Sequence, residues 1–98
     1  MSQGEKDAAL LFGLVMMFQT AAMQHMGKLK NPATDKIERD LDQAQFAIDT
    51  LDMLMAKTKG NLSDEEERFM KTVVKELKLN FVDEMGKGEK STESKEPT

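Results

Sequence analysis

His25 is the only histidine of this chain, and histidine is the residue type that most often transfers protons near neutral pH. It lies close to the predicted end of an N-terminal helix, where its charged form would favour the helix dipole. Catalysis would also require a nucleophile or an acid that the histidine orients. No serine lies near it in the sequence. We therefore expect a surface histidine and no enzymatic activity.

The segment Lys57-Thr58-Lys59-Gly60-Asn61-Leu62 is the most distinctive local feature. Two lysines near the start of a helix could hold an anion, because the free amides of a helix N-terminus attract negative charge. The four carboxylates of residues 64–67 would compete for those amides and repel an anion. We favour a structural role, in which Gly60 ends one helix with a positive φ and Leu62 anchors the loop.

A row of cations follows one face of the predicted third helix: Arg68, Lys71, Lys75 and Lys78. This spacing would suit an acidic partner or a nucleic-acid backbone. Glu67 lies four residues before Lys71 and favours a solvated, ion-paired face instead. The candidate anion-binding residues are Lys57, Lys59, Lys71 and Lys75. They define our alternative function, a small nucleic-acid- or anion-binding protein.

Asp42, Asp49 and Asp52 are the remaining group that could do chemistry. Metal sites built from carboxylates converge several ligands on one point, whereas a row along one helix face diverges into water. The chain also has no cysteine, which excludes disulfides, thiolate nucleophiles and cysteine-bound metals. We expect no metal and no cofactor, and the missing cysteine fits a cytoplasmic location.

The charge balance limits the partners. The 98 residues are 33% charged with a net charge of -4, which describes a soluble, mildly acidic surface. Binding to nucleic acid needs a concentrated positive field, and so does binding to anionic membranes. Nucleic acid and membranes are therefore unlikely partners by composition.

The elements that must position these residues are helices. Apolar spacing predicts an all-α fold with helices at about residues 8–27, 40–59 and 63–85. The signals for their ends are two glycines and two capping-box pairs: Gly27, Gly60, Asp40 with Gln43, and Ser63 with Glu66. The connector from Gly60 to Leu62 is short, so the second and third helices should form an antiparallel hairpin.

The segments outside the three predicted helices are polar. Residues 1–7 should be loose, and residues 28–39 should form a polar connector. Residues 86–98 contain no apolar side chain to bury, so we predict a disordered tail. Residues 1–85 then form a single helical domain, which the length also suggests.

The first helix is apolar on every side. The uninterrupted run over residues 8–18 is shorter than the roughly 20 residues that span a bilayer, and its acidic lead argues against a signal peptide. Two other helices cannot cover an all-round apolar helix. Four of the nine methionines lie here, where methionine could equally fill the core or form an adaptable binding face. We predict a homodimer with interface residues Leu11, Phe12, Val15, Met16 and Phe18.

The residues around the junction resemble those of a known family. The matching positions are Ile48-Asp49-Thr50-Leu51, Leu54, Lys57 to Leu62 and Glu66, with looser matches at Phe12, Ala21-Ala22, Met26-Gly27, Leu41 and Phe81-Val82. The chain resembles the small bacterial proteins grouped as domain of unknown function eighteen-forty-four, over roughly residues 10–83. The resemblance implies an all-helical bacterial protein of the cytosol. It transfers no catalytic residue, because the family has no assigned activity.

The sequence thus favours a non-enzymatic helical interaction or adaptor protein. It would self-associate through its apolar N-terminal helix, most simply as a homodimer, and it could also bind another protein. The supplement that a small chain without disulfides needs for stability would come from this association.

Overall fold

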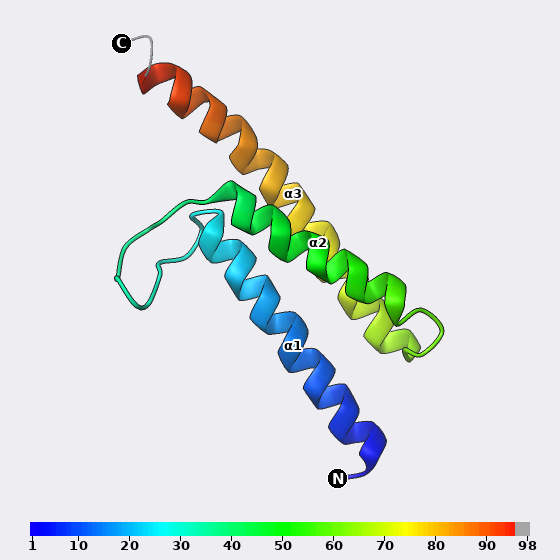
Figure 1. Cartoon of the computed structure of the whole chain (residues 1–98). Coiled ribbons are helices and arrows are strands. Elements are labelled where there is room, and N and C mark those ends of the chain that lie inside the picture. Colours follow the sequence, from blue (N-terminus) through cyan, green and yellow to red (C-terminus); the bar gives the residue numbers. More distant parts are fainter. Residues whose placement is uncertain (96–98) are drawn as a thin grey trace.

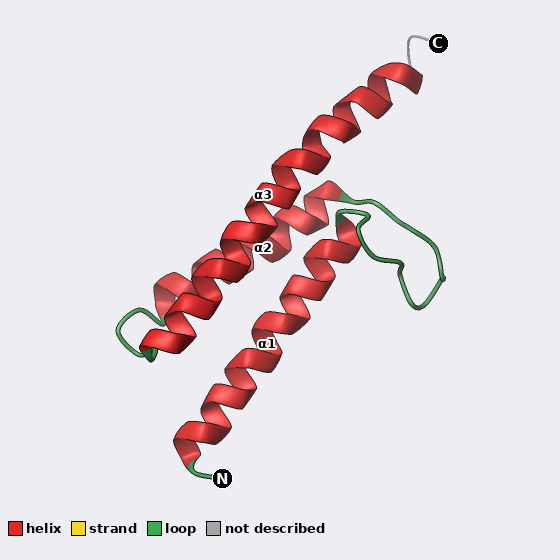
Figure 2. Cartoon of the chain, turned by 180° about the vertical axis from the view of Figure 1, so that it is seen from behind, coloured by secondary structure: helices red, strands yellow, loops and turns green. Residues whose placement is uncertain are grey.

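The computed structural model describes residues 1–95 and the side chains of residues 1–87. It contains three helices, α1 Gln3–His25, α2 Leu41–Lys57 and α3 Asp64–Lys95 (Figure 1). Within these residues there is no strand, and an isolated bridge joins Asn31 to Lys36 (Figure 2). The predicted all-α fold with three helices is confirmed.

Helix α1 begins five residues earlier than predicted, because its first turn is capped. The Ser2 hydroxyl accepts a hydrogen bond from the Glu5 amide at 3.1 Å, and the Glu5 carboxylate accepts one from the Ser2 amide at 2.9 Å. This reciprocal capping box satisfies amides that a helix start otherwise leaves free. The prediction of a loose segment over residues 1–7 is therefore wrong for residues 3–7.

The end of α1 and the start of α2 meet. Gly27 has a φ of +84°, and the amides of Gly27 and Lys28 donate to the carbonyls of Gln24 and Met23. These two bonds form a Schellman motif, which confirms Gly27 as the helix stop. The amide of Asp40, the N-cap of α2, donates to the carbonyl of His25 at 2.8 Å. The two ends of the connector of residues 28–39 therefore lie close together.

The junction between α2 and α3 has the predicted stop and start signals. Gly60 has a φ of +88°. Ser63 and Glu66 form the expected capping box, with bonds of 3.1 and 2.8 Å. Helix α2 ends at Lys57, two residues earlier than predicted, and Thr58 caps it.

Helix α2 runs toward this junction and α3 runs back from it, so the two lie side by side in opposite directions (Figures 1 and 2). An ion pair of 2.8 Å between Lys78 Nζ and Asp52 Oδ2 joins them. Helix α1 packs against both. The core between the three helices consists of small and medium apolar side chains: Val15, Ala22, Met26, Ala44, Ala47, Ile48, Leu51, Met70, Val73, Val74 and Leu77.

Helix α3 is longer than predicted, since it ends at Lys95 and not at residue 85. Lys87 forms ion pairs with Asp83 at 3.2 Å and with Glu84 at 3.3 Å, across Gly86. Such pairs three and four residues apart support a helix through a weak position. Residues 96–98 of the expected tail lie outside the described residues, and disorder of the tail stays a prediction.

Candidate interaction surface

Helix α1 has two faces of different exposure. Val15 and Ala22 are buried, and Leu11 and Phe18 pack against the core. A neighbouring side carries Leu10, Leu14 and Met17, which are 62%, 37% and 60% exposed. These three residues have the spacing i, i+4, i+7, so they lie on one line along the helix. We call them the outer stripe of α1.

The structure corrects the predicted interface. Val15 is fully buried inside its own chain, so the prediction that it contacts a second copy is wrong. Leu11 and Phe18 are only partly accessible, because they pack against the same core. Phe12 and Met16 are exposed, as an interface requires. Leu10, Leu14 and Met17 were not among the predicted interface residues. A helix that is apolar on every side gives no signal for which face its own chain covers.

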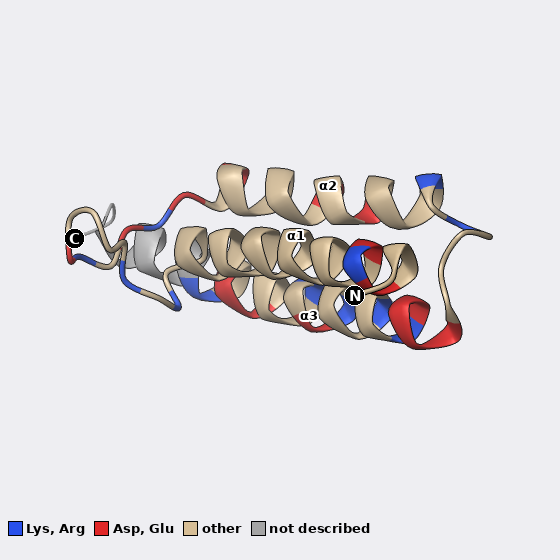
Figure 3. Cartoon of the chain, turned by 90° about the horizontal axis from the view of Figure 1, so that it is seen from below, with Lys and Arg blue, Asp and Glu red and all other residues tan. Residues whose placement is uncertain are grey.

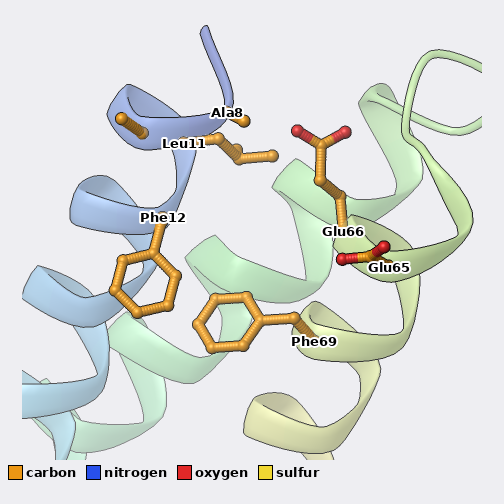
Figure 4. Close-up of a pocket in the computed structure, with 7 residues that line it drawn as sticks. Ala8, Leu11, Phe12, Glu65, Glu66 and Phe69 are labelled. Atoms are coloured by element: carbon orange, nitrogen blue, oxygen red, sulfur yellow. The ribbon is translucent and has the colours of Figure 1, made fainter. Parts of the chain in front are cut away.

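A groove of about 390 Å³ lies where α1 passes the start of α3. Its lining is apolar apart from two carboxylates: Ala8, Ala9, Leu11, Phe12, Glu65, Glu66 and Phe69. The rings of Phe12 and Phe69 stack with centroids 4.8 Å apart and face each other in Figure 4. Phe12 thus holds α1 against α3 and also borders exposed apolar surface.

The four candidate anion-binding lysines do not converge in one site. Lys59 and Lys71 line one groove of about 410 Å³, together with the carboxylates of Asp52 and Glu67. Lys71 Nζ lies 3.0 Å from Glu67 Oε2, the solvated ion pair that the sequence predicts. Lys75 lines a neighbouring groove, and Lys57 lines none of the grooves described. The mixed charge around Lys59 and Lys71 disfavours an anion there.

The remaining candidates occupy separate positions. His25 is half-buried at the end of α1. Asp49 accepts a hydrogen bond from Gln45 Nε2 at 2.8 Å, while Asp52 pairs with Lys78. Among the described residues, no group of three or more histidines or carboxylates is arranged to hold a metal ion.

A cluster of charges, at the end of the bundle where the connector of residues 28–39 lies, was not predicted from the sequence. Glu84 is 8% exposed, and its carboxylate forms ion pairs with Lys28 Nζ at 2.8 Å and with Arg39 Nη2 at 3.3 Å. Arg39 also donates to the backbone carbonyl of Glu84. Lys28 and Arg39 begin and end the polar connector, so this cluster fastens both ends of the connector to α3. Residues this far apart along the chain give no pattern that could reveal the contact.

The cluster shifts the pKa values of its members. The hydrogen bond from Lys28, followed by that from Lys87, holds the pKa of Glu84 below its ordinary value of 4.5 despite burial. The pKa of Asp83 is lowered by its hydrogen bond with Lys87, and the pKa of Lys87 is raised by the same bond. All three groups are charged at neutral pH, which suits a structural ion-pair network.

Helix α1 is long and apolar enough to cross a membrane, judged by length and composition alone. It has 23 residues and a mean hydropathy of 1.3 in its most apolar part. The apolar run of residues 8–18 is too short to span a bilayer, but the helix that contains it, Gln3–His25, is long enough, and this corrects the expectation from the sequence. The core helix of a soluble protein can have the same length and composition.

The fold and the surface together define a small all-helical protein with exposed apolar side chains along its first helix. The chain belongs to the family described as Domain of unknown function (DUF1844), whose profile matches residues 8–83. The match includes the outer stripe of α1 and the junction between α2 and α3. No curated protein and no solved structure matches the chain.

Proposed function

We propose that this protein is a non-enzymatic helical interaction protein that binds a second copy of itself through the outer stripe of α1. The observation that carries the proposal is the exposure of Leu10, Leu14 and Met17 on a helix whose other face is already in the core. Burying such side chains stabilises an assembly by about 25 cal/mol for each Å² removed from water. Phe12 and Met16 are exposed as well, but they lie on another side of α1, where Phe12 stacks on Phe69 of α3.

The spacing of the outer stripe suits a partner helix. Apolar residues at i, i+4 and i+7 form the seam along which two helices pack. Gly13 is a helical residue with no atom of another residue close to the position of a Cβ. The open space at Gly13 lets a neighbouring backbone approach there. Figure 3 shows α1 almost free of charge along its length, so no desolvated charge opposes the contact.

A second copy fits this surface better than a membrane does. A bilayer-spanning α1 would have to withdraw Val15, Ala22 and the helix-capping Met26 from the core, where all three are fully buried. That withdrawal would uncover the apolar faces of α2 and α3 to water. A pairing of two outer stripes leaves the core intact. We also propose that the protein is cytoplasmic and that it binds further protein partners, as an adaptor does.

The test is the mass of the Leu14→Glu variant in solution. We expect sedimentation equilibrium at micromolar concentration to give an oligomer for the wild type and half its mass for the variant. The helical circular dichroism should be retained, because Leu14 is exposed and does not belong to the core. Val15→Glu is the matched comparison at the next residue, and it should unfold the chain. A monomeric wild type, or an unchanged mass of the variant, would refute the proposal.

Lipid vesicles distinguish the membrane explanation. The wild type and Leu14→Glu are floated with vesicles of neutral and of anionic phospholipid. We expect both proteins to stay out of the lipid fraction. Flotation of the wild type that the substitution abolishes would assign the outer stripe to lipid, and the proposal of self-association would then be wrong.

A further inference from the structure

The outer stripe of α1 lies on the side of that helix that faces away from α3. Phe12 marks the side toward α3, because its ring stacks on Phe69. One residue corresponds to about 100° around a helix, so Leu10 and Leu14, two residues before and after Phe12, lie about 160° from it. Met17, five residues after Phe12, lies about 140° from it. The stripe therefore belongs to a face of the bundle that α3 does not cover.

Helix α2 has two exposed apolar side chains that also face away from α3. Phe46 and Met53 are 67% and 49% exposed. Met55 marks the side of α2 toward α3, since it lines two grooves together with Lys71 of α3. Phe46 lies nine residues before Met55, which is two and a half turns, and Met53 lies two residues before it, so both are on the opposite side of α2. We call Phe46 and Met53 the outer pair of α2.

The outer stripe and the outer pair lie at the same level of the bundle. The amide of Asp40 donates to the carbonyl of His25, and α1 and α2 run in opposite directions from this point (Figure 1). With an equal rise per residue in both helices, Phe46 is level with about residue 19 of α1 and Met53 with about residue 12. The stripe covers residues 10–17, and α1 packs against α2. The five side chains therefore form one apolar patch, which we call the α1–α2 face.

The outer stripe alone is too small for a stable dimer. Stable interfaces bury about 800 Å² on each partner. Leucine and methionine are smaller than the aromatic residues, which bury roughly 150–250 Å² each, and the three side chains of the stripe are already partly covered. They cannot supply the required area by themselves. A face that two helices share, with a phenylalanine on the second helix, can.

A second copy covers the α1–α2 face better than a lipid surface does. Asp42 and Asp49 lie four residues before and three residues after Phe46, so their carboxylates border the outer pair. Against a membrane, these carboxylates would be pressed toward the lipid together with Phe46. At a protein interface, they stay in the hydrated rim around an apolar centre. An apolar face also needs no opposite charge, so it matches its own copy.

We propose that the second copy contacts the whole α1–α2 face, so that Phe46 and Met53 are interface residues together with the outer stripe. This inference rests on the proposed function and deepens it, because it assigns half of the contact to α2. Two such faces stack about a two-fold axis as a layer of four helices, with α3 of each copy outside. The contact uses the face of both copies completely. The assembly therefore stops at a dimer, twice the chain mass of 11.0 kDa.

The experiment replaces both residues of the outer pair in the full chain, by Phe46→Gln together with Met53→Gln. Glutamine is a good helix former and adds no charge beside Asp42 and Asp49. Sedimentation equilibrium should give a dimer for the wild type. The double variant should have a dissociation constant at least about tenfold higher, because apolar area is lost from the contact.

Leu79→Gln together with Val82→Gln is the matched control. These two apolar side chains of α3 are 63% and 66% exposed, and they line the groove between α2 and α3, away from the α1–α2 face. The control should change the dissociation constant less than about threefold. Circular dichroism and thermal melts should show that both double variants are folded.

The outcomes separate this inference from the proposed function. A dimer that Leu14→Glu dissociates, but that Phe46→Gln with Met53→Gln leaves intact, would overturn the role of α2 and leave the contact of α1 standing. A monomeric wild type would overturn both. Equal weakening by the two double variants would overturn the inference as well, because exposure and not position on the α1–α2 face would then decide. A wild-type mass above that of a dimer would contradict the closed contact.

Discussion

At the scale of single residues, Glu84 is the polar group that holds both ends of the connector of residues 28–39 against α3. Its carboxylate forms ion pairs with Lys28 and Arg39, at the two ends of the connector, and with Lys87 of its own helix. Removing one partner of a buried charge pair is costly, because the remaining charges lose their counterion without regaining full hydration.

Glu84→Gln therefore destabilises the protein. It keeps the shape of the side chain but leaves Arg39 without its carboxylate and Lys28 with only the more distant Asp83, at 3.5 Å. We expect a loss of roughly 1–3 kcal/mol in the free energy of unfolding at pH 7, measured by urea denaturation. Asp83→Asn is the control, since the exposed Asp83 should matter less. Equal effects of the two substitutions would show that the burial of Glu84 is unimportant.

The same contact makes stability depend on pH in a defined direction. Folding lowers the pKa of Glu84, because Lys28 and Lys87 stabilise its ionised form. The stabilisation is then fully present above the ordinary value of 4.5 and is lost as the pH falls through the lower value of the folded state. The difference between wild type and Glu84→Gln should therefore shrink below pH 4.5. A difference that stays constant into strong acid contradicts this.

Gly27 is the residue whose backbone most restricts substitution. Its φ of +84° is unfavourable for any side chain, although a Cβ there would meet Arg39 and Ile37 only at ordinary distances of 3.6–3.7 Å. Gly27→Ala should cost about 1–2 kcal/mol of unfolding free energy by thermal or urea denaturation, through backbone strain alone. An unchanged stability would mean that the Schellman motif is dispensable.

At the scale of elements, the sequence predicts helices well and helix faces unevenly. The stripes of α2 and α3 alternate with polar residues, so their buried positions, such as Ile48, Leu51 and Leu77, follow from periodicity. Helix α1 offers no such contrast. Leu14 and Val15 are equally apolar neighbours, and only packing decides that one is exposed and the other buried. The early start of α1 had a local signal, the pair of Ser2 and Glu5, which the polar composition of the segment obscured.

Helix α3 gives a prediction about its own length. Gly86 lies inside the helix, where glycine weakens a helix by roughly 0.5–1 kcal/mol relative to alanine. A Cβ at this position would meet nothing within 4 Å. Gly86→Ala should therefore raise the unfolding free energy by about that amount. No gain in either stability or helical circular dichroism would place the end of the helix before Gly86, where the sequence predicted it.

At the scale of the whole molecule, the bundle has apolar surface on two separate sides. One face of α1 packs in the core, and its outer stripe stays exposed. The α2–α3 pair has a second exposed surface, which carries charged side chains. The sequence could predict that the first helix is apolar on every side, because that follows from the uninterrupted run of residues 8–18. It could not predict the cluster around Glu84 or the match between Asp52 and Lys78, since both join residues that meet only after folding.

The absence of cysteine provides the most direct test of self-association through α1. A single Leu14→Cys substitution places one thiol on the outer stripe, and Ala33→Cys places one on the exposed connector as a control. Under mild oxidation at micromolar concentration, we expect Leu14→Cys to form a disulfide-linked dimer at least about tenfold faster than Ala33→Cys, because two outer stripes then already lie against each other. Equal rates for the two variants would contradict it.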